Sequence, residues 1–109
     1  MLSLIAKGRT TTMKAAVWID RVKTAKGIES DYAAAKTLGI SRAVVSSYRG
    51  AIPTMDEDTA VKVALALDVN PVVILADQAM ERSKSEPAKK AWKEVLEKLG
   101  ASQLYIMLS

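Results

Sequence analysis

The chain has 109 residues, of which 50% are hydrophobic and 26% are charged, and these values are typical of one globular domain. It contains neither Cys nor His, so disulfides and thiolate metal sites are excluded, and the commonest general base and metal ligand are missing. No apolar stretch approaches the ~20 residues of a membrane span, and no secretory-signal pattern is present. We therefore expect a cytoplasmic protein that contacts no membrane.

Basic charge gathers in the first half of the chain. Residues 1–50 carry nine basic and three acidic side chains, a net charge of +6, whereas residues 51–109 carry seven and nine, a net charge of −2. Such an asymmetry favours a polyanion-facing first half. It is a weak signal by itself, because many basic proteins of this size bind no anion.

The first elements in chain order are an extension and a helix. Residues 1–13 show no helical period and are interpreted as an N-terminal extension. A helical period begins at Lys14 and ends at Lys26-Gly27, where a cation and a following glycine are typical of a helix end. Its apolar face, which predicts the core side of the helix, consists of Ala15, Trp18, Ile19 and Val22.

Two short helices follow, over residues 31–38 and 42–48. Ser30 and Ser41 are the predicted N-caps, and Asp31 would favour the positive end of the first helix dipole. Gly39 ends the first of these helices because glycine adopts the positive φ of a sharp turn. Gly50 follows the second.

Two longer helices are predicted next. The series Thr54-Met55-Asp56-Glu57 fits a capping box that opens the fourth helix, and Asn70-Pro71 combines a cap with an N1 proline to open the fifth. The predicted inward side chains are Ala60, Val63, Ala64 and Leu67 in the fourth helix, and Val72, Leu75, Ala76 and Ala79 in the fifth.

A sixth helix begins at Ser85-Glu86-Pro87 and ends at Gly100. Its apolar stripe contains Ala88, Ala91, Trp92, Val95, Leu96 and Leu99. Either this helix folds back on its own domain or the stripe contacts a second subunit. The apolar residues 104–108 form a short tail with strand-like character, so residues 85–109 are predicted to contribute to dimerisation.

The pair of short helices fits the packing of a helix-turn-helix unit. Ala35 is small enough for the position where the two helices cross, and Gly39 turns the chain. Ile40 fills the space beneath the turn, and Val45 reaches it from the second helix.

With this order of residues, the chain from Trp18 to Leu75 resembles the Cro/C1-type helix-turn-helix domain of phage repressors and related bacterial regulators. The resemblance rests on Ala35, Leu38-Gly39-Ile40-Ser41, Val45, Tyr48-Arg49-Gly50 and the string from Asp58 to Pro71. It implies an all-α fold with a five-helix DNA-binding domain over residues 14–84. The sequence departs from the family at Asp31, where Gln is common, and at Tyr48, where Trp is frequent.

The resemblance implies that the second short helix enters the major groove of DNA. Arg42 would bind a guanine, the methyl group of Ala43 would meet a thymine methyl, and the serines would reach base edges or phosphates. Lys36 and Arg49 flank this helix and suit phosphates. The predicted DNA-binding residues are Lys36, Ser41, Arg42, Ala43, Ser46, Ser47 and Arg49. The alternative is that these side chains are merely solvated and that Ser41 only caps its helix.

The function indicated is sequence-specific binding of a homodimer to a palindromic double-stranded DNA operator, with transcriptional repression as the outcome. An antitoxin, or a protein-interaction module that has lost DNA binding, is the alternative. No enzyme is indicated, because no serine is accompanied by a base and Asp56, Glu57 and Asp58 are explained as helix-start residues. No cofactor, metal or small-molecule ligand is expected.

Overall fold

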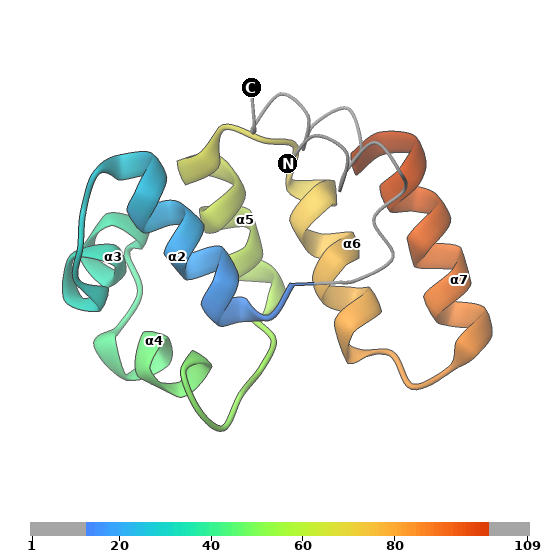
Figure 1. Cartoon of the computed structure of the whole chain (residues 1–109), viewed down its shortest axis with the longest axis horizontal. Helices are drawn as coiled ribbons and strands as arrows, with labels where there is room; N and C mark the ends of the chain where they lie inside the picture. Colours follow the sequence, from blue (N-terminus) through green and yellow to red (C-terminus); the bar gives the residue numbers. More distant parts are fainter. Residues whose placement is uncertain (1–12, 101–109) are drawn as a thin grey trace.

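The computed structural model describes residues 13–100, and all its regular elements are helical (Figure 1). The helices are α2 (Ala15–Lys26), α3 (Asp31–Leu38), α4 (Arg42–Tyr48), α5 (Glu57–Leu67), α6 (Pro71–Arg82) and α7 (Glu86–Val95), followed by a π-helical turn η1 (Leu96–Gly100). The all-α expectation is confirmed for these residues. The strand-like tail 104–108 and the extension before Met13 lie outside the described residues.

The starts and ends of the two short helices follow the predicted caps. The Ser30 hydroxyl accepts a hydrogen bond from the Ala33 N–H at 3.0 Å, and the Ser41 hydroxyl accepts one from the Val44 N–H at 3.1 Å. Gly39 has a φ of 69° and ends α3 in the left-handed conformation that glycine adopts without strain.

The capping box predicted at Thr54 is wrong, because Asp56 is the N-cap of α5. The residue between them explains the shift. Met55 is buried, and its N–H donates to the side-chain oxygen of Gln78 at 2.9 Å. The tertiary bond of Met55 holds this residue in the loop against α6, and α5 begins after Asp56.

The inward face predicted for α6 is also wrong in part. Ala76 is buried as expected, but Val72 is exposed, and Leu75 and Ala79 are only half-buried. The buried positions are Val73, Ile74, Ala76, Asp77 and Gln78. The error has a physical reason: hydropathy assigns Asp and Gln to the outside of a helix, whereas here both lie against the core.

Asp77 and Gln78 hold two distant parts of the chain against α6. Asp77 is 0% exposed, and its carboxylate accepts hydrogen bonds from the Trp18 indole N–H at 2.9 Å and from the Met13 N–H at 3.2 and 3.3 Å. The Gln78 amide donates to the Met13 carbonyl at 2.8 Å while its oxygen accepts from Met55. A buried polar group costs little when it is hydrogen-bonded in this way. These bonds therefore fix the start of α2 and the loop before α5.

The sixth predicted helix folds back on its own domain, since α7 packs against α6. No residue within α7 itself is buried, and Trp92 is 38% exposed. Leu96, in the π-helical turn, enters the core, and Val95 packs against it. Within residues 13–100, no helix is both long and apolar enough to cross a membrane.

Asp77→Ala should destabilise the domain by about 3 kcal/mol, because the Trp18 and Met13 donors would lose their buried acceptor. Asp77→Asn, which keeps one acceptor oxygen, should reduce the free energy of unfolding by a smaller amount. The free energy of unfolding is measured by urea denaturation, with Glu94→Ala on the exposed side of α7 as the control. A loss for Asp77→Ala no larger than the control's would contradict the assigned role.

Candidate nucleic-acid interface

The pair α3–α4 is built around the small side chains that the sequence indicated. Ala35, Leu38 and Val45 are buried, and Ile40 is half-buried against the same core. The burial expected of these residues is therefore observed, whereas their places at the crossing and beneath the turn stay a prediction.

The opposite side of α4 faces solvent. Arg42, Ala43 and Ser46 are exposed, whereas Val45 and Tyr48 are buried on the inner side of the same helix. α3 and α4 lie at one end of the molecule, and α7 lies at the other (Figure 1). The outer face of α4 is thus an accessible helical surface on a well-packed support.

The predicted serines differ in how they are used. Ser41 caps α4, and the Ser47 hydroxyl donates to the Val44 carbonyl of its own helix at 2.6 Å. Ser46 makes no hydrogen bond through its hydroxyl to any described residue, and it is exposed. Ser46 is therefore the serine with its full hydrogen-bonding capacity available to a ligand.

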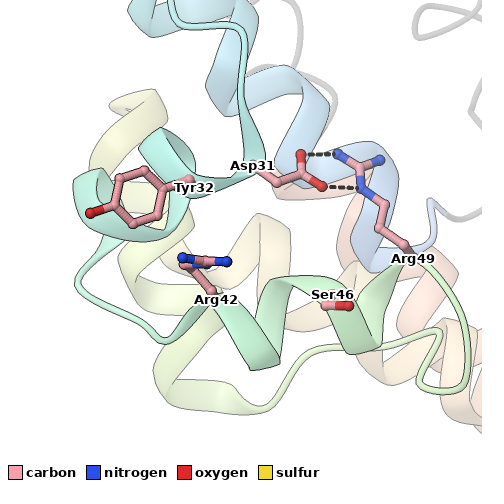
Figure 2. Close-up of a pocket in the computed structure, with 5 residues that line it drawn as sticks. All are labelled: Asp31, Tyr32, Arg42, Ser46 and Arg49. Atoms are coloured by element: carbon pink, nitrogen blue, oxygen red, sulfur yellow. Dashed lines mark hydrogen bonds and ion pairs between the residues drawn. The ribbon is translucent and has the colours of Figure 1, made fainter.

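A shallow cavity of about 310 Å³ separates the start of α3 from α4, lined by Asp31, Tyr32, Arg42, Ser46 and Arg49 (Figure 2). Tyr32 was not predicted as a site residue. This residue is 53% exposed, and the centroid of its ring lies 5.1 Å from the guanidinium carbon of Arg42 and 5.8 Å from the Lys36 ammonium. The spacing of Tyr32 and Lys36, four residues apart on a helix, was the sequence signal for one of these contacts.

Arg49 is held by two carboxylates from other helices. Its guanidinium donates to both oxygens of Asp31 at 2.9 and 2.7 Å, and to both oxygens of Asp20 at 3.2 and 2.7 Å. Lys23 adds an ion pair to Asp31 at 3.1 Å. Figure 2 shows the paired bonds between Arg49 and Asp31. We call Asp20, Lys23, Asp31 and Arg49 the charge cluster.

The charge cluster is electrically balanced and shifts the titration of its members. Hydrogen bonds from Arg49 lower the pKa of Asp31 to about 2 against the opposing effect of burial, with Lys23 as a further cause. The same guanidinium lowers the pKa of Asp20, and the two carboxylates raise the pKa of Arg49. With two charges of each sign, the cluster adds no net charge to this end of the protein.

The predicted cationic residues are therefore not equivalent. Arg49 was expected to bind a phosphate, but its guanidinium donates hydrogen bonds to the two carboxylates of the charge cluster. Lys36 and Arg42 have no carboxylate partner among residues 13–98. Sequence reasoning assigned Asp31 to the start of its own helix, and the structure adds the bonds to Arg49 and Lys23. No group of side chains in the described part of the chain could hold a metal ion.

Comparisons with models of protein families, with curated proteins and with solved structures find no match. The interpretation of this surface therefore rests on its own geometry and on the residues that form it.

Asp31→Asn should destabilise the protein near neutral pH and not in acid. A carboxyl whose pKa falls from 3.8 to about 2 on folding stabilises the fold above pH 3.8, and the effect disappears as the pH falls toward 2. Because Asp31 is 39% exposed, we expect at most about 1 kcal/mol.

Urea denaturation of both proteins at about pH 7 and again near pH 2 measures this difference. Glu94→Gln, which neutralises an exposed carboxylate on α7, is the matched control. An equal deficit of Asp31→Asn at both pH values would assign the loss to packing and not to charge.

Proposed function

We propose that this protein is a sequence-specific double-stranded DNA-binding regulator of the Cro/C1 helix-turn-helix type, acting as a homodimer. The observation that supports this proposal most directly is the outer face of α4. It presents Arg42, Ala43 and Ser46 to solvent from a helix that is anchored by Val45 and Tyr48. A short exposed helix on a rigid support has the dimensions that fit the major groove.

The distribution of charge at this end of the molecule supports the same function. Lys36 on α3 and Arg42 on α4 approach the same ring, so two cations that have no carboxylate partner within residues 13–98 lie close together. The acidic side chain that lines the cavity beside Arg42 is Asp31, and its charge is balanced by ion pairs with Arg49 and Lys23. A phosphate backbone approaching this surface would meet net positive charge.

The side chains on this surface suit different parts of the duplex. The guanidinium of Arg42 can donate two hydrogen bonds to O6 and N7 of a guanine, and the methyl group of Ala43 can contact a thymine methyl. Lys36 carries a compact charge that suits a phosphate and distinguishes no base. We therefore assign sequence readout to Arg42 with Ala43 and Ser46, and positioning to Lys36.

Dimerisation is part of the proposal because one such unit reads only a few base pairs. Two copies related by a two-fold axis would read a palindromic operator, and their affinities would combine. Residues 85–109 remain the proposed contact. The exposure of Trp92 on α7 supports this assignment, since α7 leaves a large aromatic side chain at the surface. Occupying an operator that overlaps a promoter would make the protein a repressor.

The proposal is tested first by binding to a random-sequence duplex about two helical turns long, followed by fluorescence anisotropy. Between about 50 and 200 mM salt, each phosphate contact should cost about threefold in affinity. Lys36→Ala should reduce the slope of log K against log salt by about one per subunit. Lys90→Ala is the matched control, because it removes the same charge from α7 at the opposite end of the molecule.

Three outcomes would count against DNA binding at this surface. The first is no binding even at low salt, which would favour the protein-interaction module. The second is a binding constant that does not change with salt. The third is an equal effect of Lys36→Ala and Lys90→Ala, which would mean that only net charge matters and that α3 does not approach the duplex.

Arg42→Ala should weaken binding to the preferred sequence by about 1–3 kcal/mol, the contribution of a bidentate contact to one base. The preferred sequence is obtained by repeated selection from a pool of random duplexes with the unmodified protein, and it should contain an inverted repeat. Binding of the variant to a scrambled duplex should change little. An equal loss on both duplexes would assign Arg42 to a phosphate, and readout would then depend on DNA shape or on Ser46.

A further inference from the structure

Tyr32 has no structural task that explains its position. Tyr32 is 53% exposed at the first turn of α3, and it is not part of the buried core. It nevertheless lies over the guanidinium of Arg42, with 5.1 Å between the ring centroid and the guanidinium carbon. Figure 2 shows the Arg42 side chain extending from α4 toward Tyr32.

We propose that Tyr32 is a positioning residue, which holds the guanidinium of Arg42 against its ring so that the donor edge of that group is presented to a guanine in the major groove. This inference rests on the proposed function and names the base feature that the site recognises. Tyr32 contributes to specificity through Arg42 and makes no base contact of its own.

The two interactions of Arg42 use different parts of the same group. An aromatic ring attracts a guanidinium through its flat face, where the ring's negative charge density lies. Hydrogen bonds to O6 and N7 of guanine use the N–H groups at the edge of the guanidinium plane. A cation–π contact with Tyr32 does not use the N–H groups of Arg42 as hydrogen-bond donors, so they stay available, and the contact restricts side-chain rotamers that would otherwise be lost only on binding.

The charge cluster makes this arrangement possible. Asp31 lines the same cavity as Arg42 and would be its natural ion-pair partner. Both of its oxygens are already engaged by Arg49, and one of them also by Lys23. Since the nearby carboxylate is occupied, the ring is the partner that Arg42 has among the residues that the structure describes.

Lys36 lies farther from the same ring, at 5.8 Å from the centroid, and its ammonium has no fixed donor plane. The ring therefore orients Arg42 and not Lys36. The consequence is that loss of the ring should affect discrimination between sequences and leave the salt dependence of binding unchanged.

The test compares Tyr32→Leu, which removes the ring, with Tyr32→Phe, which keeps the ring and removes the hydroxyl. On the duplex selected with the unmodified protein, Tyr32→Leu should weaken binding about 2- to 5-fold per subunit, the range of an exposed cation–π contact. Tyr32→Phe should bind as the unmodified protein does. On the scrambled duplex, all three proteins should bind equally and with the same salt slope.

A modified base identifies the feature that Arg42 reads. Replacing the selected guanines one at a time with 7-deazaguanine removes the N7 acceptor and leaves O6 in place. At one position per half-site, this replacement should reduce the affinity of the unmodified protein and of Tyr32→Phe more than it reduces the affinity of Tyr32→Leu. The affinity of the Arg42→Ala variant should not change when the guanine at that position is replaced.

The contact itself is measured without DNA. In proton NMR, the ring current of Tyr32 should move the Arg42 side-chain protons upfield, and this shift should persist in Tyr32→Phe and disappear in Tyr32→Leu. Failure of the unmodified protein to bind any duplex would overturn the proposed function and this inference together. Specific DNA binding that is the same for Tyr32→Leu would overturn this inference alone. Tighter binding by Tyr32→Leu would also overturn it, because the ring would then hold Arg42 away from the duplex.

Discussion

The fold depends on two polar side chains that lie where hydropathy would place apolar ones. Asp77 and Gln78 are adjacent on α6 and buried, and between them they bind the start of α2 and the loop before α5. Arg82, one turn later, donates to the Met55 carbonyl at 2.9 Å and continues this row of bonds. A purely apolar α6 would pack against the core without fixing the register of either segment. These hydrogen bonds therefore hold α2, which precedes the α3–α4 pair in the chain, and the loop before α5, which follows it.

A second constraint acts at the exposed surface: its two arginines, Arg49 and Arg42, have different kinds of partner. Arg49 is enclosed by the carboxylates of Asp20 and Asp31, and it ties the end of α4 to α2 and α3. Arg42 is left with an aromatic ring, which holds it without neutralising it. Arg49 thus contributes to the support of α4, whereas the N–H donors of Arg42 would be available to a ligand. These partners come from different helices, since Asp20 lies on α2, Asp31 on α3 and Arg49 at the end of α4.

Much of the fold could be predicted from the sequence because its signals are local. Ser30, Ser41 and Gly39 act within a few residues of their own position, and the apolar face of α2 follows from its period alone. The start of α5 and the inward face of α6 could not be predicted, since the bond between Met55 and Gln78 joins residues 23 apart. In the candidate site, too, some features follow from local sequence and others depend on tertiary packing. The exposure of Arg42 and Ser46 follows from the helix, whereas the partners of Arg49 required the packed structure.

The enclosure of Arg49 has a consequence for how the proposed regulator would search DNA. A cation that already has carboxylate counterions inside the protein displaces few condensed ions from a duplex, and the release of such ions supplies most of the affinity for non-cognate sequence. With Lys36 and Arg42 as the cations left over on this surface, residence on unrelated DNA would be short and sliding along it limited. Recognition would then depend on encounters with the operator itself, and a larger share of the total affinity would come from bases rather than from the backbone. In the proposed regulator, the charge cluster would thereby slow the search along DNA and raise the ratio of specific to non-specific binding.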